Sequence, residues 1–73
     1  MKTSQKIIQE LETKNSWGKN QLREMVHSVS FGMSMSVNEI NAIQEFFATI
    51  ETKNSWGKNE AKSAFADCLS KHI

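Results

Sequence analysis

Apolar residues recur along this chain at the spacing of amphipathic helices. Leu22, Met25, Val26 and Val29 follow an i, i+3, i+4, i+7 pattern, which places their side chains on one face of a helix. Similar spacing occurs in three other segments, and the absence of proline leaves all of them free to be helical. The pattern predicts four short helices, at about residues 3–13, 17–29, 38–51 and 56–71.

One nine-residue segment, Glu-Thr-Lys-Asn-Ser-Trp-Gly-Lys-Asn, occurs twice, at residues 12–20 and 51–59. Nine consecutive identities in a chain of 73 residues indicate an internal repeat. Apolar positions also match around the two copies, although the residues themselves differ. The turn is therefore under a constraint that both copies share: either the hairpin needs this local geometry, or both copies contact the same kind of partner.

These patterns together predict an all-α fold of two tandem helix–turn–helix hairpins. A chain of this length forms one domain, residues 1–73. Within it we expect a repeat at 1–29 and 40–73, joined by a connector at 30–39.

The residue types in the repeated segment suggest how each turn is built. Asn15 and Asn54 can end the preceding helix in the left-handed conformation, and Ser16 and Ser55 are good N-cap residues for the next helix. A capping box is not expected, because lysine stands three residues after each serine.

Glycine follows tryptophan in both copies, at Gly18 and Gly57, where we expect the first turn of the next helix. Glycine is unfavourable inside a helix, so its presence suggests that something approaches the backbone closely. The free N–H groups of a first helical turn, together with the adjacent Lys19 or Lys58, could bind an anion. A solvated turn is the alternative for these lysines.

Trp17 and Trp56 allow two interpretations. Each can anchor its turn in the core, since tryptophan buries a large area. Each can instead lie in an interface, where tryptophan often dominates binding. On the second interpretation, the candidate partner-binding residues are Lys14, Asn15, Ser16, Trp17, Gly18, Lys19 and Asn20, and Lys53, Asn54, Ser55, Trp56, Gly57, Lys58 and Asn59.

The connector has a different pattern, because Val29, Phe31, Met33, Met35 and Val37 alternate with serine or glycine. Such alternation is typical of a strand, and it permits a short β-strand at about residues 30–36. A linker whose apolar residues cover the hairpins is the alternative.

The order strand, helix, turn, helix over residues 29–73 resembles the ribbon-helix-helix family of DNA-binding dimers. The resemblance implies a strand that pairs across a homodimer and enters the major groove. The outward strand residues would then be Ser30, Gly32, Ser34 and Ser36, whereas the family more often places Lys, Arg, Gln or Asn there.

The composition of the chain restricts the kinds of site that it can contain. Cys68 is the sole cysteine, which excludes an intramolecular disulfide, and His27 and His72 add too few ligands for a structural zinc site. We expect no cofactor, no catalytic residues and no metal. The N-terminus lacks a signal-peptide pattern and no apolar run could span a membrane, so we expect a cytoplasmic protein.

The sequence therefore favours a small, non-enzymatic interaction protein. It would bind a larger protein or complex through its two repeated turns, as small phage- or plasmid-encoded regulators and inhibitors do. The small core and the apolar connector favour a homo-oligomer. The alternative function is that of a homodimeric, ribbon-helix-helix-like regulator that binds nucleic acid.

Overall fold

The computed structural model describes residues 2–73, with side chains from residue 3, and confirms the all-α prediction. It contains four helices and one short two-stranded antiparallel sheet. In chain order the elements are α1 (Lys2–Leu11), β1 (Ser16–Gly18), α2 (Lys19–Ser30), α3 (Val37–Ile50), β2 (Ser55–Gly57) and α4 (Lys58–His72).

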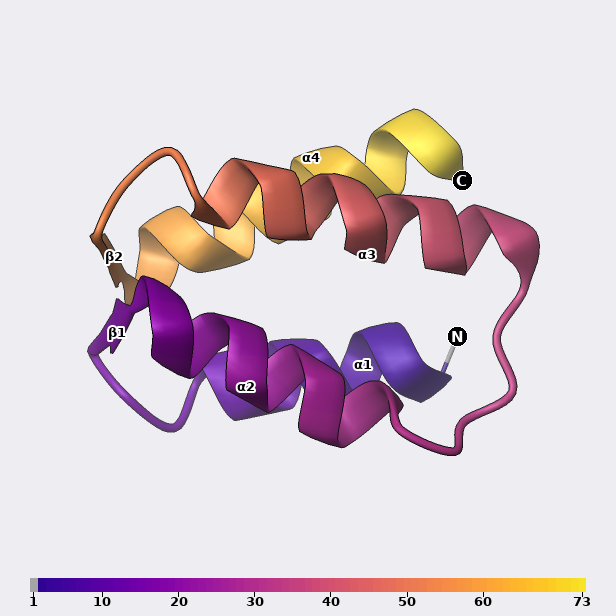
Figure 1. The fold of residues 1–73 in the computed structure, drawn as a ribbon, viewed down its shortest axis with the longest axis horizontal. Coiled ribbons are helices and arrows are strands. Elements are labelled where there is room, and N and C mark those ends of the chain that lie inside the picture. Colours follow the sequence, from indigo (N-terminus) through magenta and orange to yellow (C-terminus); the bar gives the residue numbers. More distant parts are fainter. Residues whose placement is uncertain (1) are drawn as a thin grey trace.

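The helices form two hairpins that lie one on the other (Figure 1). In the first hairpin α1 contacts α2, and in the second α3 contacts α4. Contacts between α2 and α3 and between α1 and α4 join the hairpins. Both repeated turns lie at one end of the molecule, and the connector from α2 to α3 lies at the other.

The two copies of the repeated segment pair with each other. β1 and β2 are antiparallel, and Trp17 is the partner of Trp56 in the register. Just beyond the strands, the N–H of Lys19 donates to the Asn54 carbonyl (3.0 Å), and the N–H of Lys58 donates to the Asn15 carbonyl (2.9 Å). Because positions 39 residues apart make the same bonds in exchanged roles, the hairpins are related by a pseudo-two-fold axis through the sheet.

The core lies between the hairpins and takes matching positions from both. Phe46 and Phe65 fill the second hairpin with an edge-to-face contact whose ring centroids are 5.0 Å apart. The equivalent positions of the first hairpin hold the smaller Ile7 and Val26. The buried apolar residues are Ile7, Leu11, Trp17, Leu22, Met25, Val26, Ala42, Ile43, Phe46, Ile50, Trp56, Ala61, Phe65 and Cys68.

The pairing of the repeated segments corrects the expected turn chemistry. Ser16 and Ser55 are the first strand residues and do not cap a helix, so the helices after them begin two residues later than expected. Gly18 and Gly57 take the N-cap positions, with extended backbones. No non-glycine residue in the described chain has a positive φ, so Asn15 and Asn54 are not left-handed.

The connector does not form the strand that its alternation permits. Residues 31–36 form a turn and an irregular segment, with the one positive φ of a described glycine at Gly32. Met33 and Met35 are half-buried, and Met35 packs against the core, as expected for a linker that covers the hairpins. In a single chain this segment has no neighbouring strand with which to pair, so the ribbon-helix-helix resemblance stays a prediction.

Candidate functional site

The two tryptophans anchor the repeated segments in the interior. Trp17 is 5% exposed and Trp56 is 8% exposed. The indole Nε1–H of Trp17 donates to the Leu11 carbonyl, and that of Trp56 to the Ile50 carbonyl, each at 3.2 Å. The last carbonyls of a helix have no partner within the helix. Each tryptophan therefore satisfies the end of the helix that precedes it, while its ring fills the core.

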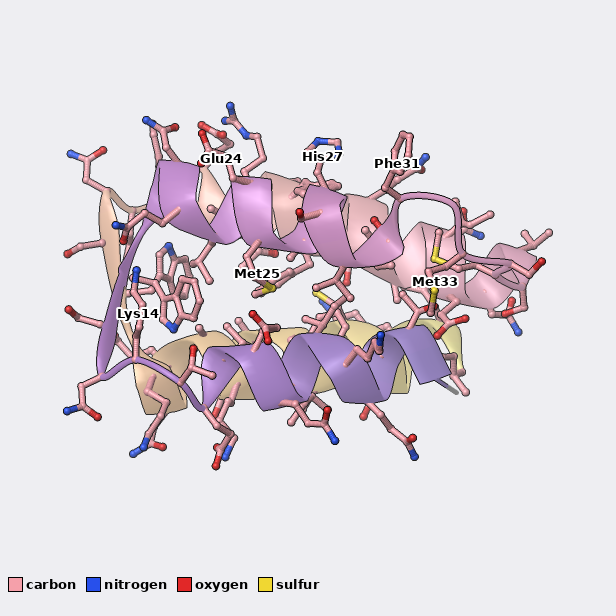
Figure 2. All side chains as sticks on the ribbon, turned by 90° about the horizontal axis from the view of Figure 1, so that it is seen from below. Lys14, Glu24, Met25, His27, Phe31 and Met33 are labelled. Atoms are coloured by element: carbon pink, nitrogen blue, oxygen red, sulfur yellow. The ribbon has the colours of Figure 1, made fainter. Side chains whose placement is uncertain are left out.

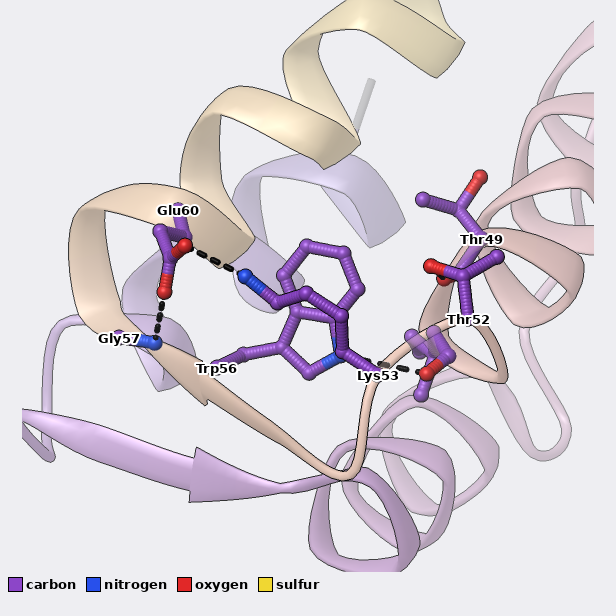
Figure 3. Close-up of polar contacts among 7 residues, drawn as sticks. Thr49, Thr52, Lys53, Trp56, Gly57 and Glu60 are labelled. Carbon is purple, nitrogen blue, oxygen red and sulfur yellow. Dashed lines mark hydrogen bonds and ion pairs between the residues drawn. The ribbon is translucent and has the colours of Figure 1, made fainter.

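A lysine covers each indole ring from the solvent side. The Lys14 ammonium lies 4.4 Å from the ring centroid of Trp17, and the Lys53 ammonium lies 4.5 Å from that of Trp56. A cation over an aromatic face is attracted by the ring quadrupole. Of the two, only Lys53 also has an acidic partner among residues 3–73, because it forms an ion pair with Glu60 (Figure 3).

Ion pairs connect the two hairpins in a pseudo-symmetric way. Glu12 of the first repeat pairs with Lys62 on α4, and Glu51 of the second pairs with Arg23 on α2. Lys62 and Arg23 are 39 residues apart, as are the two glutamates. Lys19 adds a second cation to Glu51 at 3.3 Å. The glutamate of each repeat therefore makes an equivalent ion pair with the opposite hairpin.

These contacts affect the ionisation of the carboxyl groups. A hydrogen bond from Lys62 lowers the pKa of Glu12 below its usual value. A hydrogen bond from Lys53, together with one from the N–H of Gly57, lowers the pKa of Glu60. Both carboxyl groups are therefore held in the charged form that their partners require.

Two of the backbone donors at the start of each helix, which were expected to bind an anion, are already in use. The N–H of Gly18 donates to Gln21 Oε1 and that of Gly57 to Glu60 Oε1, each at 2.9 Å. The next N–H, at Lys19 or Lys58, donates to the other repeated segment. The group that approaches each glycine is thus a side chain three residues later in the same helix.

The side chains at three positions in each copy take no part in these contacts. In both copies the Glu, Thr, Trp and first Lys side chains contact an indole ring, a helix end or the opposite hairpin, and Lys19 also contacts the opposite hairpin. The first Asn, the Ser and the final Asn are exposed. The exposed side chains without such a contact are those of Asn15, Ser16, Asn20, Asn54, Ser55 and Asn59. Within residues 3–73 none of these side chains makes a hydrogen bond to another residue.

The two histidines and the cysteine lie away from the repeated turns. His27 stacks on Phe47, with ring centroids 4.8 Å apart, and His72 Nε2 lies 3.5 Å from Glu45. Cys68 is buried, and burial raises the pKa of its thiol. In the part of the chain that the structure describes, no group of three or more His, Cys, Asp or Glu side chains could hold a metal ion.

Glu39 has a structural role that the sequence analysis did not predict. This carboxylate is buried and accepts hydrogen bonds from the Ser4 hydroxyl (2.9 Å) and the Ser4 N–H (3.2 Å). It thereby satisfies a free donor in the first turn of α1 from the opposite hairpin. No local pattern indicates this contact, because the two residues are 35 positions apart.

None of the described helices combines the length and the apolar character that a membrane crossing needs. Comparison with protein-family models, with curated proteins and with solved structures found no match to this chain. The case for a function therefore depends on the residues of the chain itself.

Proposed function

We propose that this chain is a non-enzymatic interaction protein that binds a larger protein or complex through the end of the molecule where its two repeated segments meet. Both copies lie at this end, side by side and antiparallel, because β1 and β2 pair there. The surface consequently offers the same side chains twice, related by the pseudo-two-fold axis.

The observation that carries this proposal is that some residues are identical in both copies although their side chains make no contact that stabilises the fold. In the first copy, contacts within the chain account for Glu12, Thr13, Lys14, Trp17 and Lys19. In the second copy they account for Glu51, Thr52, Lys53 and Trp56, whereas the Lys58 side chain makes no ion pair within the described residues. They do not account for the side chains of Asn15, Ser16 and Asn20, which are exposed and identical in both copies. Exposed polar side chains on a rigid turn are well placed for binding.

The proposal is tested with a variant that changes only this surface. Asn15→Ala, Ser16→Ala, Asn54→Ala and Ser55→Ala together remove four exposed groups that make no side-chain hydrogen bond within the described chain. Substitutions of this kind usually change stability by no more than about 0.5 kcal/mol each. The fold should therefore persist, as judged by circular dichroism and by urea unfolding.

The control variant removes as many exposed polar side chains elsewhere on the surface, through Gln5→Ala, Gln9→Ala, Asn41→Ala and Gln44→Ala. The parent and the control should retain the same partner from extracts of the source cell, and the turn variant should lose it. If the turn variant retains the partner as well as the control does, binding does not use this surface.

Nuclease treatment of the extracts separates the two classes of partner. The proposal expects capture that survives the treatment. The alternative, a ribbon-helix-helix-like regulator, expects a nucleic acid that disappears with nuclease and whose affinity falls steeply with salt. The latter result would replace the proposed function with the alternative.

A further inference from the structure

Two pseudo-equivalent residues, Gln21 and Glu60, differ in a way that leaves one lysine without an acidic partner in the part of the chain that the structure describes. Each accepts a hydrogen bond from the N–H of the N-cap glycine through Oε1. In Glu60 the second carboxylate oxygen also pairs with Lys53, over the ring of Trp56 (Figure 3). In Gln21 the second polar group is an NH₂, which cannot accept a hydrogen bond from Lys14.

Lys14 borders an open groove between α1 and α2. The groove has a volume of about 530 Å³ and is lined by residues of the first hairpin, including Trp17, Met25 and Val29. Met25 points from α2 towards α1, and Lys14 lies at the turn end of the same face (Figure 2). An apolar floor is thus combined with a cation that makes no ion pair within the described residues.

We propose that this groove binds an acidic side chain of a protein partner, with the carboxylate on Lys14 and neighbouring apolar groups on Met25 and Val29. The carboxylate would form an ion pair with Lys14, equivalent to the pair of Glu60 with Lys53 in the second hairpin. This inference rests on the proposed function in taking the partner to be a protein. It concerns a different surface from the exposed Asn and Ser side chains.

The other charges of the groove define which acidic ligand fits. Glu10 and Glu24 also line it, and neither makes an ion pair within the described residues. Two carboxylates beside one ammonium repel a chain of closely spaced anions, such as a nucleic acid backbone. They oppose a single carboxylate less than a polyanion, and they attract basic residues beside it. The acidic ligand that fits best is therefore one acidic residue flanked by apolar or basic residues, as in a protein segment.

The site is tested directly by titrating the full chain with the acetylated, amidated tripeptide Leu-Glu-Leu, with Leu-Gln-Leu as the matched control. The indole N–H signals of Trp17 and Trp56 in a ¹H–¹⁵N spectrum report on the two lysine sites separately. We expect the glutamate peptide to shift the Trp17 signal and to leave the Trp56 signal in place. The glutamine peptide should shift the Trp17 signal less, by up to about fivefold at equal subsaturating concentration, which corresponds to the loss of one surface charge pair.

Exchanging the two residues that differ should move the site from one hairpin to the other. Gln21→Glu supplies the missing carboxylate internally, so the Trp17 response should disappear. Glu60→Gln frees Lys53, so a response should appear at Trp56. Lys14→Gln should abolish the Trp17 response without affecting Trp56.

The proposal is overturned if the parent shows no glutamate-dependent shift at Trp17. It is equally overturned if Gln21→Glu responds as the parent does, or if both indoles shift together in the parent. Because the probe is a peptide, these results do not depend on capture of the partner. The turn variant of the preceding section should still bind the tripeptide, so a failure of either proposal can be told from a failure of the other.

Discussion

Replacing Trp17 or Trp56 with phenylalanine tests how much each tryptophan of the repeated segments contributes to the stability of the fold. Phenylalanine keeps most of the aromatic packing but removes the indole N–H that donates to the Leu11 or the Ile50 carbonyl. A buried acceptor left without its partner destabilises a protein by about 1–3 kcal/mol. The smaller ring also leaves part of the indole volume unfilled, at about 0.8 kcal/mol for each buried group of CH₂ size.

We therefore expect each substitution to lower the free energy of unfolding by about 2–4 kcal/mol. A domain of this length has a total stability of about 4–11 kcal/mol. A variant of a parent near the middle of this range should remain mostly folded at room temperature. The loss should be somewhat smaller for Trp56→Phe, because the Ile50 carbonyl also accepts a hydrogen bond from the Lys53 N–H (3.4 Å).

Urea unfolding followed by far-UV circular dichroism measures the loss, and the fluorescence of the remaining tryptophan reports on the other repeat. An unchanged dependence on urea would show that both variants unfold from an equally compact state. A loss below about 0.5 kcal/mol at either position, the range typical of surface substitutions, would refute the assignment of that tryptophan to the core.

Three further predictions concern charge and burial. Because Glu12 and Glu60 have a pKa lowered below the usual 4.5, the stability they contribute is present above that pH and is lost as the pH falls through their folded-state pKa values; acid titration of the unfolding free energy should show this loss, and Glu12→Gln should reduce it. Cys68, whose thiol is buried with a raised pKa, should react slowly with iodoacetamide in the folded protein and rapidly in urea, and equal rates would contradict its burial. Ser4→Ala should lower the unfolding free energy by about 1–3 kcal/mol in thermal or urea unfolding, because the substitution removes the hydroxyl that donates a hydrogen bond to the buried Glu39 carboxylate. No measurable change would show that water replaces the hydroxyl.

The pseudo-two-fold arrangement changes the meaning of the repeated segment. In the sequence, nine identical residues allow either a shared geometric need or a shared partner. The pairing of β1 with β2 makes the two copies each other's neighbours, so a residue chosen for one copy also suits the other. Contacts within the chain account for Glu12, Trp17 and Lys19, and the partner proposal is needed only for the exposed Asn and Ser.

The helical hairpins were determined by the sequence itself. An amphipathic helix depends on residues three and four positions apart, so a stripe such as Leu22, Met25, Val26 and Val29 reports its own buried face. The burial of Cys68 could be predicted for the same reason, because it lies on the apolar face of the last helix.

The contacts that the repeated segments make were decided by the tertiary structure alone. Strands of three residues are too short to show an alternating pattern, and each is stabilised by a partner 39 positions away. The pairing of Glu12 with Lys62 and the burial of Glu39 beside Ser4 likewise join residues that only the fold brings together. The difference between Gln21 and Glu60 is visible in the sequence, but it acquires a chemical meaning only when Lys14 and Lys53 are placed over their tryptophans.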